Sequence, residues 1–345
     1  MLIKRKYIYI IVALSLLFGL LACAVAGYSY VALTSFNKSE KPYHLYIDRD
    51  DSADSVLNKL RPISGHWEYK ALELITKADR YEQMVKTGHY IIPNGESTFN
   101  LYRKLRGGIE TPVMLVVPAV RTMNDMALRL SKSLMVDSAE LARNFADSSF
   151  CGIFKKTPET ISCLFIPNSY EVYWDITPAE LLQRMQKESN RFWTEKRKKQ
   201  AEVLGLSLEE VITLASIVEQ ETIYAPEKST VAGMYLNRLR RGMLLQADPT
   251  VKFALKDFQL RRILHKHLAV ESPYNTYLYP GLPPGPICVP SIQSIDAVLN
   301  AATHNYIYMC AKEDFSGSHN FATNYAQHQR NARKYAAALN AKKIK

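Results

Sequence analysis

The first feature of the hydropathy pattern is a long apolar run near the N-terminus. Residues 7–37 contain no charged residue, and residues 8–27 are enough, at ~1.5 Å per helical residue, to cross a bilayer core of ~30 Å. Basic residues stand at 4–6, and the next is Lys38. This pattern predicts a cytosolic stub and one transmembrane anchor within residues 1–37, with the rest of the chain outside the cytosol. A cleaved signal peptide is the alternative, but the run is long and has no Ala-x-Ala exit.

A strand-turn-helix pattern then recurs three times between residues 43 and 135. The segments are HLYIDRDDSADSVLNKL, YIIPNGESTFNLYRKL and MLVVPAVRTMNDMALRL. Each has a β-rich run, then a hydroxyl residue that suits a helix N-cap (Ser52, Ser97 or Thr122), then apolar residues four apart on one helix face. The pattern resembles LysM-type modules, which bind cell-wall glycans. A packing domain without a ligand is the alternative.

The pattern of apolar and capping residues in the second half of the chain predicts mostly helices. Residues 138–150 have helical character, and Thr177 with Pro178 starts a helix expected to run to about residue 200. Ser207-Leu-Glu-Glu is a capping box that starts another helix at Leu208, and a further helix is expected over 227–241.

Net charge and cysteine spacing exclude some classes of protein. The formal charge of +11 is compatible with nucleic acid, but a domain outside the cytosol meets anionic wall polymers and headgroups instead, so no nucleic-acid partner is expected. The cysteines form no CxxC pair, which argues against structural zinc. Whether Cys151 and Cys163 are bonded to each other is left open by the sequence.

Two glutamates interrupt the apolar pattern of the helix that starts at Leu208. Glu219 and Glu221 fall on opposite margins of its expected buried stripe, which is centred on Val211, Leu214, Ala215, Val218 and Thr222. Most glutamates in such places are structural, for example paired with a nearby arginine. A partly desolvated carboxyl, however, has a raised pKa that suits a general acid near neutral pH. Periodicity does not choose between the two glutamates.

Three segments after residue 242 carry the side chains of an expected cleft. Residues 243–255, 272–291 and 317–328 are rich in polar and aromatic residues, and we expect them to be loops. The middle segment contains GLPPGPI, whose prolines lack N–H donors and whose glycines favour turns. A rigid loop rich in Asn and Tyr suits one wall of a sugar-binding cleft.

Together these segments resemble a known enzyme family. SIVEQET, NRL, LLQADPTV, SPYNTYLYPGLPPGPI and SHNF resemble motifs of the YceG-like endolytic murein transglycosylases over residues 216–328. The resemblance implies an α+β chain with an inner-membrane anchor, a LysM-like subdomain at 43–135, and a mainly helical catalytic domain with a loop-rich cleft at 136–345 on the periplasmic side. One departure is VPAVRTMND, where the family has an acidic residue and a glycine.

The resemblance also implies a reaction and partners. Such enzymes cleave the β-1,4 bond between N-acetylmuramic acid and N-acetylglucosamine, and the muramyl C6 hydroxyl attacks C1 to leave a 1,6-anhydro end. One carboxyl suffices, first as acid and then as base, and no cofactor is expected. By the motif SIVE, Glu219 is assigned as the catalytic residue and Glu221 as a residue that lines the cleft. Peptidoglycan strands are the implied substrate, and peptidoglycan synthases are the implied partners of an enzyme that terminates nascent strands.

Further binding residues are carried over from the same resemblance. The substrate-binding set is Glu221, Asn237, Gln246, Asp248, Asn275, Tyr277 and His319. For Asp248 and Asn237 a bracing role is the alternative. His319 and His328 have no third ligand at a convincing spacing, so no metal site is expected and His328 is expected to pack.

Two other functions stay open at this stage. A hydrolytic muramidase would need a second carboxylate, for which Asp248 is the candidate. A membrane-anchored peptidoglycan-binding protein without catalysis would not depend on either glutamate.

Overall fold

The computed structural model describes residues 2–260 and 262–341, and the chain forms two compact units. The first extends to Met114 and includes Glu171–Ile176, and the second comprises Leu115–Tyr170 and the chain from Thr177 onward. Met1 and residues 342–345, which belong to the predicted domains, lie outside the described residues. The predicted boundaries at 37, 43, 135 and 136 stay predictions.

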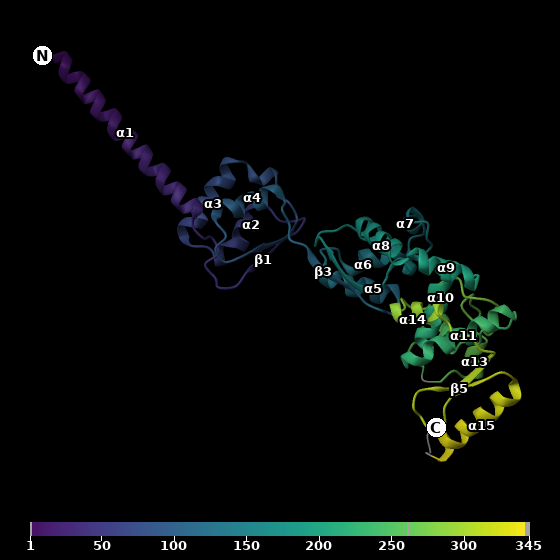
Figure 1. The fold of residues 1–345 in the computed structure, drawn as a ribbon. Helices are drawn as coiled ribbons and strands as arrows, with labels where there is room; N and C mark the ends of the chain where they lie inside the picture. Colours follow the sequence, from purple (N-terminus) through teal and green to yellow (C-terminus); the bar gives the residue numbers. More distant parts are fainter. Residues whose placement is uncertain (1, 261, 342–345) are drawn as a thin grey trace. The chain divides into compact units, whose positions relative to one another are not determined.

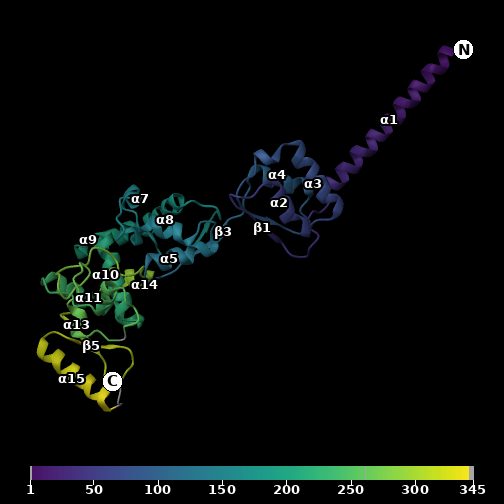
Figure 2. The ribbon, with the colours of Figure 1, turned by 180° about the vertical axis from the view of Figure 1, so that it is seen from behind.

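The N-terminal element is one long helix, α1 (Leu2–Leu33), drawn in purple in Figure 1 and Figure 2. Its segment Tyr7–Leu33 has a mean hydropathy of 2.7, and none of its most apolar window is buried. By length and composition this segment can cross a membrane. A signal sequence has the same character, so the helix is compatible with the predicted anchor.

The first unit is built on a two-stranded antiparallel sheet, β1 (Tyr43–Ile47) and β2 (Gly88–Ile92), in which Leu45 lies opposite Tyr90. Its core forms where the buried faces of the sheet and the helices meet, and it includes Ile47, Leu60, Leu72 and Leu101. The helices of this unit that follow α1 are α2 (Ala53–Leu60), α3 (His66–Ala78) and α4 (Thr98–Gly107).

The three predicted strand-turn-helix units are confirmed. The side chains of Ser52, Ser97 and Thr122 each accept a hydrogen bond from the backbone N–H three residues on, so each is a helix N-cap. The third strand-turn-helix segment consists of β3 (Val113–Val117) and α5 (Met123–Leu130), and β3 pairs with β4 (Asn168–Val172). The boundary between the two compact units falls after Met114, so most of this third segment belongs to the second compact unit.

The second unit is mainly helical, as predicted. Its elements after α5 are α6 (Ser138–Ala146), α7 (Ser148–Ile153), α8 (Pro178–Phe192), α9 (Glu195–Leu204), α10 (Leu208–Glu221), α11 (Lys228–Arg240), α12 (Asp248–Leu255), α13 (His265–Leu268), α14 (Ile292–Leu299), β5 (Tyr308–Ala311), β6 (His319–Ala322) and α15 (Tyr325–Ala341). The antiparallel pair β5–β6 precedes α15. The cap predicted at Thr177 and the capping box predicted at Ser207 are both present, and Thr177 also forms a capping box, with Glu180.

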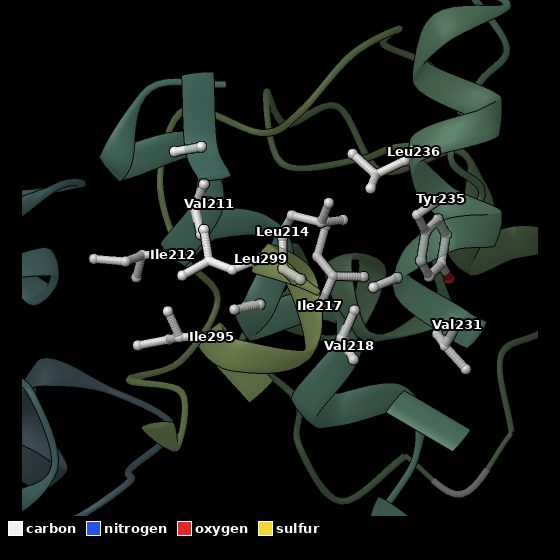
Figure 3. Close-up of a cluster of buried hydrophobic side chains, with 14 of the residues drawn as sticks. Val211, Ile212, Leu214, Ile217, Val218, Val231, Tyr235, Leu236, Ile295 and Leu299 are labelled. Atoms are coloured by element: carbon white, nitrogen blue, oxygen red, sulfur yellow. The ribbon is translucent and has the colours of Figure 1, made fainter. Parts of the chain in front are cut away.

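Helix α10 is the centre of the second unit. Residues 211–218 are all buried, because α9, α11, α12 and α14 pack around the helix. Figure 3 shows Leu214, Ile217 and Val218 among side chains of α11 and α14, such as Val231 and Ile295. The predicted single buried stripe is therefore too narrow for this helix.

Several predicted elements differ from the structure. The helix expected over 178–200 is two helices, because the side chain of Thr194 caps a new start. Asp147 divides the helix expected over 138–150 in the same way. The segments 243–255 and 317–328 are not wholly loops, since they contain α12, β6 and the start of α15. Residues 272–290 do lack regular structure.

Cys151 and Cys163 are not bonded to each other. Both thiols are free, and both are buried. Burial raises the pKa of the Cys163 thiol to about 12, which leaves it an unreactive packing group.

Candidate active site

The last turn of α10 carries both candidate glutamates. At 100° per residue, side chains two positions apart point about 200° away from each other. Glu219 and Glu221 therefore face different surroundings although they belong to the same turn.

Glu219 is held in a buried polar cluster. Its Oε2 accepts hydrogen bonds from Lys228 Nζ at 3.0 Å, from Ser291 Oγ at 2.6 Å and from Ser294 Oγ. Burial acts to raise the pKa of Glu219, but the hydrogen bonds of both serines and of Lys228 outweigh it, so the pKa is lower than usual. The expectation that the pKa of this glutamate is raised is wrong.

Glu221 lies in a cavity of about 230 Å³. Its Oε1 accepts a hydrogen bond from the hydroxyl of Tyr235 at 2.6 Å. Burial, together with the nearby charge of Asp248, raises the pKa of Glu221 to about 7, against the opposing effect of the Tyr235 hydrogen bond. Near neutral pH this carboxyl is thus able both to give and to take a proton.

Four other predicted site residues line the same cavity: Gln246, Asp248, Tyr277 and His319. The hydroxyl of Tyr277 donates to Asp248 Oδ1 at 2.5 Å. Gln246 has a positive φ of 51°, and its backbone N–H donates to Thr276 O at 3.0 Å, which fixes where its side chain leaves the chain. The cavity therefore presents a carboxylate, a phenol, an amide and an imidazole around Glu221.

The imidazole of His319 is oriented by a second acid. Glu227 accepts hydrogen bonds from the His319 backbone N–H and from Nδ1, both at 2.8 Å. Because Nδ1 is bound to a carboxylate, Nε2 is the nitrogen free for other interactions. Glu227 itself is buried, and it also accepts a hydrogen bond from Thr222 at 3.4 Å.

Arg238 forms part of the cavity wall and holds neighbouring segments together. Its guanidinium donates to Ile307 O at 2.6 Å and to Leu245 O at 2.8 Å, and it also contacts Gln246 Oε1 at 3.3 Å. Burial lowers the pKa of Arg238 from its usual value. These hydrogen bonds to carbonyls, rather than a carboxylate partner, satisfy the buried cation.

Two predicted binding residues, Asn275 and Asn237, lie outside the lining, and so do Glu219, predicted as the catalytic residue, and His328, which was expected to pack. Asn275 is fully buried, and its amide donates to Leu268 O and Val270 O at 2.9 Å, so it shapes its own loop. Asn237 donates to the carbonyls of His304 and Tyr306, which ties α11 to that segment. His328 stacks on Tyr308, with ring centroids 5.2 Å apart.

Some residues of the site were not predicted from the sequence. Tyr235 and Glu227 come from the segment after α10, and Met309, Cys310 and Ala311 of β5 complete the lining. Tyr235 occurs at the helical spacing of a core residue. Its place in the sequence therefore does not show that its hydroxyl bonds to Glu221. Glu227 stands directly before a helix, where acidic residues are common, so its position in the sequence gave no signal of its role.

Comparisons with known proteins place the chain among murein transglycosylase relatives. The model of the YceG-like family matches residues 45–334. The chain is 30% identical over 205 residues to an endolytic murein transglycosylase of Bacillus subtilis (strain 168), covering 59% of this chain and 56% of the relative. It is 26% identical over 281 residues to an endolytic murein transglycosylase of Streptococcus pneumoniae (strain D39), covering 72% and 50% respectively.

The chain spans about half the length of the curated relatives it matches. The crystal structure of a YceG-like protein from Listeria monocytogenes superposes with a TM-score of 0.55 at 24% identity, covering 85% of this chain and 99% of that one. This last similarity concerns the fold.

Proposed function

Because the chain belongs to the YceG-like family, we propose that it is an endolytic murein transglycosylase whose general acid is Glu221. The observation that carries the proposal is the cavity around Glu221, where a carboxyl with a pKa of about 7 stands among polar side chains. A carboxyl in that state is suited to protonate a leaving oxygen near neutral pH.

In the proposed reaction the Glu221 carboxyl gives its proton to the glucosamine O4 as the bond from O4 to the muramyl C1 breaks. The muramyl C6 hydroxyl forms the new bond to C1 and loses its proton to the Glu221 carboxylate. The product ends in 1,6-anhydro-N-acetylmuramic acid, and the acid is restored. An internal nucleophile needs positioning rather than a second base, so one carboxyl is enough.

The other groups in the cavity have roles that follow from their chemistry. The Asp248 carboxylate, bound by Tyr277, is suited to stabilise positive charge that develops at C1. Gln246 and the Nε2 of His319 are suited to bind sugar hydroxyl or N-acetyl groups. Glu219 keeps the turn that carries Glu221 bound to α11 and α14, so its role is positioning.

The remaining parts of the chain fit the same function. We propose that α1 anchors the protein in the cytoplasmic membrane, with the chain after α1 on the outer side, and that the strand-turn-helix segments of the first half are LysM-like and bind glycan. An association with peptidoglycan synthases, in which the enzyme ends nascent strands, belongs to the same proposal.

The test compares Glu221→Gln with Glu219→Gln, the same substitution two positions apart, in the full-length chain in detergent micelles. Fragments released from purified peptidoglycan are identified by mass spectrometry. Wild type is expected to give anhydro ends, and Glu221→Gln to lower the rate at least ~10²-fold, as for loss of a general acid. Glu219→Gln leaves the ammonium of Lys228 buried without its carboxylate, so it is expected to lower stability by about 3 kcal/mol while the folded fraction keeps most of its activity.

Other outcomes point to other assignments. Activity lost in a folded Glu219→Gln protein and kept in Glu221→Gln would assign the acid to Glu219. Reducing ends in place of anhydro ends would indicate a hydrolytic muramidase, a second candidate because Asp248 lies in the same cavity as Glu221. No products from wild type would favour a peptidoglycan-binding protein without catalysis.

A further inference from the structure

A larger cavity, of about 380 Å³, opens elsewhere in the second unit. Most of its lining is apolar, and the rings of Phe253, Phe258 and Tyr274 form a large part of that surface together with Pro286 and Val289. None of its lining residues belongs to the cavity around Glu221. Its size and lining are those of a ligand site rather than of a packing defect.

The polar side chains around this cavity include three charged ones, beside the uncharged Thr122, Asn124 and Ser162. Arg121 and Lys256 supply two cations and Glu159 one carboxylate. The guanidinium of Arg121 lies over the ring of Phe258, 5.2 Å from its centroid, which orients the cation without neutralising it. Apolar walls with two cations and one acid suit a ligand that carries apolar groups, carboxylates and an amine.

A buried hydroxyl in the lining points to the same conclusion. Ser162 is 7% exposed, and within the part of the chain that the structure describes its Oγ has no hydrogen-bond partner. Buried hydroxyls normally have partners, because leaving one without a hydrogen bond costs free energy. A bound ligand with an amide or carboxyl group would supply the missing partner.

The larger cavity lies near the proposed general acid. Arg121 Nη2 donates to Gln220 Oε1 at 2.9 Å, and Gln220 directly precedes Glu221 in α10. Helix α12 joins the two cavities from another side, since Asp248 lines one and Phe253 the other. Asp248 and Phe253 are five residues apart, which corresponds to ~7.5 Å along the axis of α12. A substituent on a sugar bound at Glu221 would therefore need to extend only a short way to enter the larger cavity.

We propose that the larger cavity binds the peptide stem carried by the muramic acid of the substrate. A stem carboxylate would lie at Arg121 and Lys256, its amine near Glu159, its methyl groups on the aromatic walls, and a peptide amide at the hydroxyl of Ser162. This inference rests on the proposed function and adds a preference for strands that still carry peptides. A bare glycan chain does not match the site, because its hydroxyl groups call for more polar partners than the lining offers.

The first experiment measures binding to the full-length chain in detergent micelles by titration calorimetry. The probes are N-acetylmuramyl-L-alanyl-D-glutamate and the same compound with both glutamyl carboxylates converted to amides. The acid is expected to bind about tenfold more tightly than the diamide, and Arg121→Gln to remove that difference, because a charge-assisted hydrogen bond is lost. Lys187→Gln removes an exposed lysine of α8 outside the cavity and is expected to change nothing.

Ser162→Ala separates a binding role from a structural one. Because the hydroxyl has no partner among the residues that the structure describes, its removal is expected to leave the melting temperature unchanged or higher while weakening binding of the acid probe. A lower melting temperature with unchanged binding would overturn the proposal, as would equal affinity of wild type for acid and diamide or no binding of either.

The second experiment compares turnover of glycan strands with peptide stems and of strands freed of them by an amidase. Wild type is expected to prefer stem-bearing strands, and Lys256→Gln to reduce that preference, as read from kcat/KM for each substrate. Equal turnover of both strands by wild type would overturn the stem site while the transglycosylase function stood. If neither strand yields anhydro ends, the function fails, and the binding measurements still decide what the cavity holds.

Discussion

At the scale of single residues, the chemistry of the site depends on which groups surround each carboxyl. Glu219 is stabilised in its charged form by Lys228 and two serines. Glu221 has a tyrosine hydroxyl and the like charge of Asp248 nearby, and burial makes its charged form costly. Two identical side chains in one helical turn thus have pKa values displaced in opposite directions.

The pH dependence of kcat/KM follows from the raised pKa of Glu221. If Glu221 is the general acid proposed above, it works in its protonated form, so the rate is expected to fall about tenfold per pH unit above pH about 7. Asp248→Asn removes a negative charge that raises this pKa, so the decline should begin at a lower pH. The measurement is the initial rate of anhydro-end formation between pH 5 and 9.

Tyr277→Phe is the matched control for that change. It removes the hydrogen bond between Tyr277 and Asp248 but keeps the Asp248 charge, so its decline should begin where that of wild type does. A shift in Tyr277→Phe as large as that in Asp248→Asn would contradict the assignment of the raised pKa to the Asp248 charge.

At the scale of elements, the loop GLPPGPI and helix α10 are bound to each other. The backbone N–H of Ile287 donates to Ser216 Oγ at 3.0 Å, and the thiol of Cys288 contacts Ser216 O at 3.5 Å. Gly285 passes so close to the chain that an added Cβ would lie 2.1 Å from Glu159 O. These contacts restrict the backbone of the loop. The chain after it leads to Ser291, whose hydroxyl donates a hydrogen bond to Glu219.

Gly285→Ala is expected to destabilise the protein by about 1–3 kcal/mol, because a backbone carbonyl would have to move. Thermal unfolding of the full-length chain measures this loss. Gly152→Ala in α7 is the control: an added Cβ there meets no atom within 4 Å, and alanine favours a helix, so stability should stay the same or rise. A Gly285→Ala protein as stable as wild type would argue against the tight packing of this loop.

At the scale of the whole molecule, the apolar helix α1 belongs to the first compact unit, and basic residues are placed unevenly on the two sides of its apolar segment. Three lie at residues 4–6, before the segment Tyr7–Leu33, and none lies within it. Lysine and arginine stay on the cytosolic side of a membrane span, so this asymmetry decides the expected orientation. The proposed activity on wall glycan needs that orientation.

A reporter fusion tests the orientation directly. Alkaline phosphatase, which is active only outside the cytosol, is expected to be active when fused after residue 40. Replacing the three basic residues at 4–6 with glutamine should lower that activity, since the charge asymmetry is removed. An inactive fusion from the unaltered chain would contradict the orientation.

Features that depend on residues a few positions away along the chain were predictable from the sequence. The apolar run is long enough to span a bilayer whatever the rest of the chain does. The caps at Ser52, Ser97, Thr122, Thr177 and Ser207 were predictable because a cap bonds to an N–H three residues on. Motif resemblance also grouped Gln246, Asp248, Tyr277 and His319, which do line one cavity.

Which of the two glutamates has a carboxyl suited to a general acid depends on contacts between elements, and the sequence did not reveal those contacts. Helix α10 is buried on nearly all sides, so its periodicity contained no outward direction from which to choose. The pKa of each carboxyl is set by Lys228, Ser291, Tyr235 and Asp248, which come from other elements. Desolvation and Coulomb interactions depend on how close groups lie in space. The sequence shows only how far apart residues are along the chain, so it cannot give the sizes of these interactions.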